Sequence, residues 1–351
     1  DAVKSVLGRT LGIPIFQEQV IKLAVVAAGF TPGEADQLRR AMAAWKRKDG
    51  LGKFQEKLVN GMLERGHDRD FAERIFEQIK GFGNYGFPES HAASFALLVY
   101  FSAWLKRHEP AAFYCGLLNS QPMGFYSPSQ LIQDARRHHI EVRPVDVQES
   151  EWQSALEAPT YQSEIAAKQP AIRLGFQRIK GFKADSADRI IHARNYHPIQ
   201  SIKDIAKRAR LDKGDLAKLT EGGAFKSLSG HRYQTHWQVS GLLPPSPLFD
   251  ETLNVAETNE KYALQKYQEE TTVVLPPPLE TDDLRADYTS LGLTLGRHPM
   301  ALLREKPNAP FRKCKTAAEL QTLNHGRFVQ VSGIVTGRQR PSSASGVLFL
   351  T

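Results

Sequence analysis

The stretch that most constrains this chain runs from Gly81 to Pro110 (GFGNYGFPESHAASFALLVYFSAWLKRHEP). Its first six residues hold three glycines, which reach backbone angles that other residues avoid, and Tyr85 and Phe87 flank the third. Pro88 follows, and proline favours the first position of a helix. Residues 90–105 then contain no Asp, Glu, Lys or Arg before a basic end. We expect an aromatic-bearing glycine turn that leads into a buried helix and places binding residues; an ordinary loop before a core helix would have the same composition.

The size and composition of the chain narrow its class. Its 351 residues are too many for one ordinary hydrophobic core, so we expect two to four domains. The 41% hydrophobic content is typical of a globular protein, and no apolar run is long enough to span a membrane. The start of the chain has no signal-peptide core, and Cys115 and Cys314 stand far apart. We therefore predict a cytoplasmic protein without a membrane partner; both ends look cut, so we expect a fragment of a longer polypeptide.

The positive charge of the chain is concentrated in one block. Residues 173–240 carry fourteen basic and six acidic side chains, an excess that equals the net charge of +8 of the whole chain. Residues 245–290 have the opposite bias, with ten acidic and three basic side chains. A local basic block favours a polyanionic partner such as nucleic acid, with a solvated surface as the alternative.

The spacing of apolar residues predicts a mainly α-helical, multidomain fold. It indicates a helix over Ile13–Gly29, a second one that begins at the capping box of residues 31–34 (TPGE) and ends near Lys48, and two more within 51–80. Ile140–Val147 alternates as a strand does, and 157–171 is expected to be a loop or hairpin tip. The second helix carries a dense basic stripe, which is either a phosphate-binding face or a solvated one. The stripe consists of Arg39, Arg40, Lys46, Arg47 and Lys48.

Two glycine turns between short helices predict a tandem helix-hairpin-helix within the basic block. The first is Ile179–Lys183 (IKGFK) and the second contains Gly222–Phe225 (GGAF). Such a motif offers backbone N–H groups to a DNA phosphate. A small helical packing domain without a DNA partner is the alternative.

The C-terminal third gives weaker signals. Residues 241–325 are rich in proline and acidic side chains and predict a linker region, of which 288–303 could dock locally. Phe328–Thr336 alternates as a strand and Val347–Leu350 begins another, so we expect the start of an OB-type β-barrel. We expect no metal site on an Asp-x-Asp pair, and a phosphate-binding Walker loop, zinc-ligand spacing and a Gly-x-Ser-x-Gly elbow are missing from the sequence. By itself, the chain therefore binds polyanions without a complete catalytic set.

Ordered, collinear segments of the chain resemble one known family, the C-family replicative polymerases of bacteria (the DNA polymerase III alpha subunit). These segments are Gly12–Val20, Ala35–Met42, Tyr85–Ala93, Ala103–Lys106, Leu117–Ser120 and Asp134–Arg137. Three later segments resemble the error-prone, damage-tolerance branch of that family: Gly292–Pro299, Val335–Pro341 and Ala344–Val347.

The resemblance implies a domain order and a function. It implies polymerase fingers in 1–120, the end of the fingers and a connecting α/β segment in 121–170, the tandem helix-hairpin-helix in 171–240, the linker region in 241–325 and a truncated OB-fold start in 326–351. The parent would be an error-prone DNA-directed DNA polymerase that acts in translesion synthesis. This C-terminal fragment would bind incoming dNTP and primer-template DNA and would be inactive alone. A non-catalytic DNA-binding or scaffold protein is the alternative function.

The resemblance also assigns roles to individual residues. Arg39 and Arg40, with Lys46 nearby, would bind the triphosphate, because arginine binds phosphate in a bidentate way. The rest of the nucleotide pocket would be Tyr85, Gly86, Phe87, Ser90 and His91. The DNA-binding residues would be Lys180, Gly181, Lys183, Lys213 and Lys218.

The resemblance places the Mg²⁺ ions of the reaction outside this chain, on palm carboxylates upstream of Asp1. The chain departs from the family at Lys183, which stands where a second hairpin glycine is typical; the lysine would add charge instead of close approach. Damage-tolerance accessory proteins are implied partners. Direct binding to a sliding clamp is not supported, because a clear Gln-x-x-Leu/Met-Phe peptide is missing.

Overall fold

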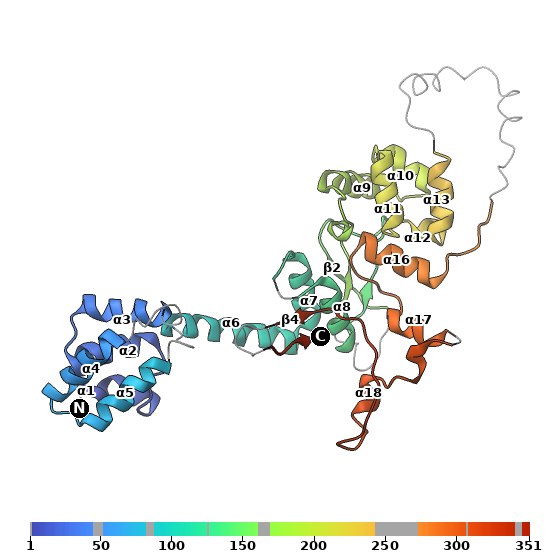
Figure 1. Cartoon of the computed structure of the whole chain (residues 1–351). Coiled ribbons are helices and arrows are strands. Elements are labelled where there is room, and N and C mark those ends of the chain that lie inside the picture. The colour runs from blue at the N-terminus through green and yellow to red at the C-terminus, as the bar shows by residue number, and fades with distance from the viewer. Residues whose placement is uncertain are drawn as a thin grey trace, which may run out of the picture. The chain divides into compact units, whose positions relative to one another are not determined.

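The computed structural model describes residues 2–44, 52–81, 88–124, 126–160, 169–242, 273–306, 308–340 and 346–351. The chain divides into two compact units, Asp1–Trp104 and Leu105–Thr351, and each is described by itself (Figure 1). Most of the described residues lie in helices, which confirms the prediction of a mainly α-helical fold.

The first unit is a group of helices around one apolar core. Its helices are α1 (Ala2–Leu7), a 3-10 turn η1 (Gly8–Thr10), α2 (Gln17–Ala28), α3 (Pro32–Ala44), α4 (Gly52–Glu64) and α5 (Arg69–Gly81). Leu23, Leu38, Met62 and Ile79 come from four of these helices and are at most 1% exposed in that core. Gly61 lets α4 approach α2, because a Cβ there would overlap the carbonyl oxygen of Ala28.

The capping box predicted at the start of α3 is present. The backbone N–H of Glu34 donates to the Thr31 hydroxyl at 3.4 Å, and the Thr31 N–H donates to the Glu34 carboxylate at 3.0 Å. The Lys57 ammonium also binds this carboxylate, and with the two Thr31 contacts it lowers the pKa of Glu34 to about 2. The local sequence therefore sets where α3 begins.

The buried helix expected after the glycine turn is not buried. α6 (Glu89–His108) forms as expected, but none of its residues is buried. Phe95, Leu98, Phe101 and Trp104 are all about half exposed, at 48%, 59%, 59% and 48%. Apolar side chains on every side of a helix predict burial only when neighbouring elements surround it. The composition of α6 does not show which neighbouring elements would surround it, so composition alone could not predict its exposure.

The second unit contains a small mixed sheet. β1 (Val142–Arg143), β2 (Ala155–Glu157) and β3 (Ala171–Arg173) have the order β1-β3-β2, with β1 parallel and β2 antiparallel to β3. The strand predicted over 140–147 is therefore found only at Val142–Arg143, and the pairing of β2 with β3 fits the predicted hairpin. α7 (Pro110–Asn119) and α8 (Pro128–Arg137) pack on the sheet.

Short helices follow the sheet and share its core. They are a 3-10 turn η3 (Phe176–Arg178), α9 (Ala184–Tyr196), α10 (Ile202–Arg208), α11 (Lys213–Glu221), α12 (Lys226–Ser229) and α13 (Arg232–Ser240). Ile172 of β3 belongs to the same core as Phe176, Ile190, Leu219 and Phe225 of this helical part, and all five are fully buried. The helices and the sheet therefore share one hydrophobic core and do not form separate domains.

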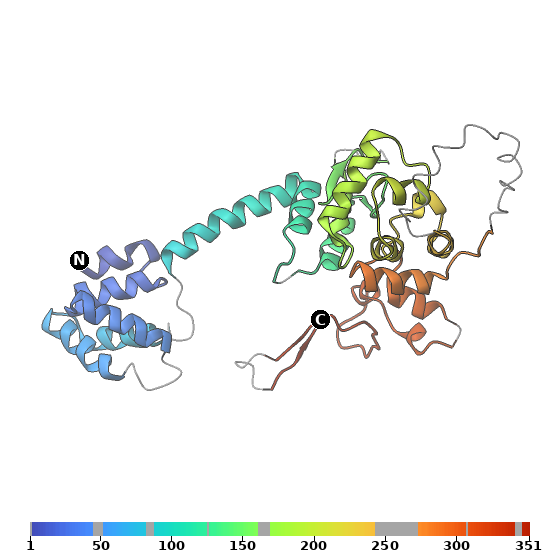
Figure 2. The ribbon, with the colours of Figure 1, turned by 90° about the horizontal axis from the view of Figure 1, so that it is seen from above.

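Part of the predicted linker folds onto these helices. α16 (Glu280–Ser290) and α17 (Pro299–Glu305) lie within the predicted linker region 241–325, and α16 packs against α11 (Figure 2). Leu293 is fully buried in the core of the second unit, and the backbone N–H of Lys180 donates to the Ser290 carbonyl at 2.8 Å. The local docking expected of 288–303 is thus present, and the segment 273–306 is not an open linker, because a few buried residues anchor a segment whose average composition is polar. Residues 243–272 lie outside the described residues.

The end of the chain has less β-structure than expected. After a 3-10 turn η5 (Pro310–Lys313) and α18 (Ala317–Leu320), β4 (Arg338–Gln339) pairs antiparallel with β5 (Phe349–Leu350). The strand predicted over Phe328–Thr336 is wrong: in the described residues this stretch has only an isolated bridge between Val331 and Lys315 and a hydrogen bond from the Thr336 N–H to the Thr351 carbonyl. A strand needs a partner to bond with, and the described residues do not form a barrel that would supply one.

Candidate nucleic-acid interface

The first hairpin, Ile179–Lys183, projects from the core at two apolar anchors. Ile179 and Phe182 are buried at 2% and 7% exposed, and the Phe182 N–H donates to the Ile179 carbonyl at 3.1 Å. Between and after them, Lys180, Gly181 and Lys183 are exposed. Gly181 has φ +72°, a left-handed conformation that favours glycine. The turn therefore presents two lysines and the Gly181 backbone to the solvent, while the Lys180 N–H is held by the Ser290 carbonyl.

The helix that follows this turn begins without a side-chain cap. Lys183 is the N-cap residue of α9 and makes no capping hydrogen bond, whereas the N-caps of α10 and α11 accept one through Ser201 and Asp212. The first N–H groups of a helix have no partner inside it and carry a partial positive charge. A cationic residue at this position leaves them available to an anion.

A second element adds charge to the same turn. Lys218 of α11 places its Cε 3.8 Å from the position that a Cβ on Gly181 would take. The structure thus brings Lys180, Gly181, Lys183 and Lys218 together. Lys213, in the first turn of α11, is exposed, and among the described residues no hydrogen bond or ion pair joins its side chain to the hairpin.

The ion pairs divide the basic block into two groups. Lys180, Lys183, Lys213 and Lys218 make no ion pair with any described residue. The basic side chains of residues 173–240 that are paired within the described residues are mostly arginines. They are Arg173, Arg189, Arg194, Arg208, Lys226 and Arg232. The lysines predicted to bind DNA therefore belong to the unpaired group.

In the first unit, the predicted phosphate-binding arginines share one carboxylate. Arg39 Nε and Arg40 Nε each lie 2.9 Å from an oxygen of Asp36, one turn earlier on α3. Their hydrogen bonds and charges, that of Arg39 first, lower the pKa of Asp36. Asp36 was not among the predicted site residues, although its spacings of three and four residues from the two arginines are typical of ion pairs along a helix.

The rest of the predicted nucleotide pocket is only partly described. Lys46, Tyr85, Gly86 and Phe87 lie outside the described residues. Ser90 and His91 are exposed in the first turn of α6, and the His91 ring lies 4.9 Å from the Phe95 ring. Within the described part, no hydrogen bond or ion pair links either of them to Arg39 or Arg40.

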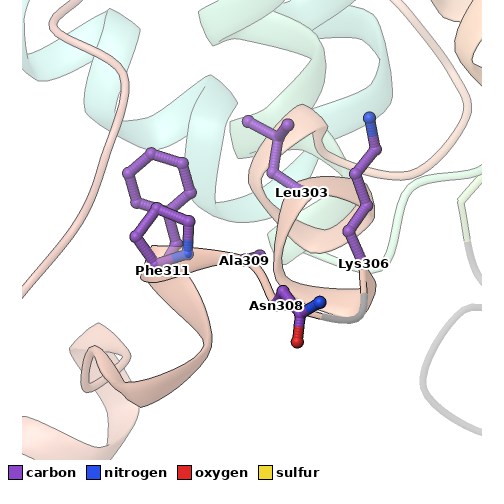
Figure 3. A pocket seen from close by; sticks show the side chains of 6 residues that line it. Leu303, Lys306, Asn308, Ala309 and Phe311 are labelled. Carbon is purple, nitrogen blue, oxygen red and sulfur yellow. The ribbon is translucent and has the colours of Figure 1, made fainter.

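A hollow beside α17 is lined by Leu303, Lys306, Asn308, Ala309, Pro310 and Phe311 (Figure 3). It contains none of the predicted site residues and no acid–base pair. Over the described ranges, no cluster of three His, Cys, Asp or Glu side chains could hold a metal ion. None of the helices in those ranges combines the length and apolar character needed to cross a bilayer.

Two family models match the chain. The model described as bacterial DNA polymerase III alpha subunit finger domain matches residues 1–66, and the one described as helix-hairpin-helix motif matches residues 139–235. The second match covers both glycine turns and α9–α12, and it confirms the motif predicted from the sequence.

Curated relatives match the whole chain. Error-prone DNA polymerase from Alkalilimnicola ehrlichii is 54% identical over 351 residues, which is 100% of this chain and 32% of the relative. The error-prone DNA polymerases of Pseudomonas aeruginosa and Teredinibacter turnerae are 53% and 54% identical to it, over 99% of this chain and 32% of each relative. The chain thus spans about a third of the length of these relatives. With its finger-domain match, its helix-hairpin-helix and this identity, the chain belongs to the bacterial DNA polymerase III alpha subunit family, on the error-prone branch.

Proposed function

We propose that this chain is the nucleotide-gripping and DNA-holding part of an error-prone DNA-directed DNA polymerase that acts in damage tolerance. The names of the relatives and the finger-domain match support the polymerase assignment. Because the chain spans 32% of those relatives, polymerisation belongs to the parent protein and not to these residues alone. Primer-template DNA and dNTPs are the partners that this role requires, in the cytoplasm of the cell. Accessory damage-tolerance proteins and an OB-fold that begins near residue 326 belong to the same proposal.

The first hairpin carries the DNA-binding part of the proposal. An exposed glycine turn, an uncapped helix start and three lysines within one patch are suited to a phosphate on the backbone of duplex DNA. Lysine is a compact point charge that binds phosphate without reading the base. This interface therefore holds DNA independently of its sequence, as a polymerase requires.

Arg39 and Arg40 carry the nucleotide-binding part. In this structure both are held by Asp36, which fixes their positions on α3 before a nucleotide arrives. A triphosphate carries more negative charge than one carboxylate, so it can compete for the guanidinium groups. Lys46, Tyr85, Gly86, Phe87, Ser90 and His91 complete the proposed pocket.

Magnesium chemistry is not assigned to the described residues. The reaction proposed for the parent uses metal ions held by carboxylates. Asp283 and Asp287 of α16, which contact the basic block, already bind Arg232. These residues do not fit a magnesium site, because the Arg232 guanidinium already occupies both carboxylates.

The salt dependence of DNA binding tests the DNA-binding part. The 351-residue chain is titrated into a fluorescein-labelled duplex, and anisotropy is measured between about 50 and 200 mM salt. Contacts from Lys180, Lys183, Lys213 and Lys218 predict a slope of log K against log salt of about −3.6, at about −0.9 per phosphate. An affinity that does not change with salt would overturn the proposal.

A further inference from the structure

The two hairpins of the domain differ in what surrounds them. The second hairpin, Glu221–Phe225, lies at the end of α11, whereas the first lies at the start of α9. The residues of the second hairpin from Gly222 to Phe225 are all buried. In the first hairpin, Lys180, Gly181 and Lys183 are exposed. In the first turn the N–H groups of Lys180 and Phe182 donate to the carbonyls of Ser290 and Ile179, but the turn lies at the surface. A phosphate can therefore reach the first turn directly and the second only if something moves away.

The backbone of the second hairpin is also occupied. The N–H groups of Gly222, Gly223 and Ala224 donate to carbonyls of α11 at 2.8, 3.0 and 2.9 Å, and the N–H of Lys226 donates to Gly223 at 3.2 Å. These are the groups that a hairpin would offer to a phosphate. The short α12 that follows has four residues, too few to present a helix dipole.

The cations beside the second hairpin are paired with α16. Arg232 is 4% exposed and binds the carboxylates of Asp283, at 2.5 Å, and Asp287. Lys226 also binds Asp283, at 3.1 Å. Both acidic residues come from a helix that lies more than fifty residues further along the chain.

α16 is fixed to the turn itself as well. The Ser290 hydroxyl donates to the Glu221 carbonyl at 3.0 Å, and Arg232 Nε donates to the same carbonyl at 3.1 Å. The ribbon shows α16 alongside the hairpin helices in both views (Figures 1 and 2). Side chain, backbone and packing contacts thus hold α16 over this hairpin.

We infer that α16 seals the second hairpin with carboxylates in place of phosphate, so that DNA is held through the first hairpin and not through the second. This inference rests on the proposed DNA-binding function and goes beyond it, since it makes the tandem motif asymmetric. A phosphate that took Arg232 would leave Asp283 and Asp287 without their main partner, which opposes the exchange. The second hairpin is then a structural joint between the basic block and α16.

Matched lysine variants of the 351-residue chain test the asymmetry. Lys180→Gln in the first hairpin is expected to reduce the steepness of the salt slope by about 0.9, the value for one phosphate contact. Lys226→Gln beside the second hairpin removes the same charge and is expected to leave the slope unchanged. An equal reduction in both variants would overturn the inference, whereas a flat slope in the unmodified chain would overturn the proposed function instead.

Hydrogen exchange gives a second readout that does not depend on the variants. On addition of duplex DNA, amides of residues 180–186 are expected to exchange more slowly, while those of 222–228 stay unchanged. New protection of 222–228 with no protection of 180–186 would contradict the inference. Circular dichroism of both variants verifies that they fold.

Discussion

Replacing Arg232 with methionine is expected to loosen α16 from the helix-hairpin-helix domain. The Arg232 side chain is 5% exposed, and its partners Asp283 and Asp287 are 29% and 18% exposed, so the substitution leaves two largely buried carboxylates without their shared cation. Removing one partner of a buried ion pair costs about 3–5 kcal/mol. Because both carboxylates keep some contact with water, and Lys226 stays close to Asp283, we expect the lower end, about 3 kcal/mol.

Hydrogen exchange of α16 measures this loss. A cost of about 3 kcal/mol corresponds to roughly a hundredfold faster exchange of the α16 amides, at about tenfold per 1.4 kcal/mol. Arg210→Met is the matched control, because Arg210 is exposed and has no ion pair within the described residues; its effect is expected below about 0.5 kcal/mol. Equal exchange in the two variants would refute the reasoning. Adding Asp283→Asn and Asp287→Asn to Arg232→Met is expected to restore part of the protection.

Acidification tests the same contact. Burial alone would raise the pKa of Asp283, but hydrogen bonds from Arg232 and Lys226 outweigh it and hold the pKa below the ordinary value. A group with a lowered folded pKa stabilises the fold above its unfolded pKa, near 3.9, and loses this effect as the pH falls through the folded pKa. In the unmodified chain, thermal stability is therefore expected to fall below about pH 4. In Arg232→Met this part of the acid loss is expected to be smaller.

Further predictions concern the first unit. Gly61→Ala is expected to lower the unfolding free energy by about 1–3 kcal/mol in urea titrations, because its Cβ would overlap the Ala28 carbonyl; an unchanged midpoint would contradict the tight approach of α4 to α2. In the parent polymerase, the double variant Arg39→Ala with Arg40→Ala is expected to raise the KM for dNTP in primer extension. Unchanged extension would contradict the assignment of these residues to the fingers. Asp36→Asn frees both arginines and is expected to tighten dNTP binding or leave it equal; a loss as large as that of the arginine variants would mean that Asp36 itself acts in the site.

Local sequence determined much of the secondary structure. The capping box at Thr31 and Glu34 set the start of α3, and the glycine turn predicted at Ile179–Lys183 is present, with Ile179 and Phe182 buried. Both signals act over a few residues, where side-chain chemistry and backbone angles decide the conformation. The family, too, follows from the residues alone, because the family-like segments occur in a collinear order along the chain.

The tertiary structure decided which charges are free and which elements are covered. Arg232 and Lys180 are both cations in one basic block. Only the position of α16 beside the second hairpin decides that Arg232 is paired with Asp283 while Lys180 stays exposed. The acidic stretch that contains Asp283 has the composition of a linker, yet the buried Leu293 and Ser290 fix it in place. Burial depends on neighbours that are distant in the sequence. α6 is the opposite of the acidic stretch, because its composition is apolar and yet none of its residues is buried. The sequence determined the chemistry available to this protein, and the contacts across the fold decided where it can be used.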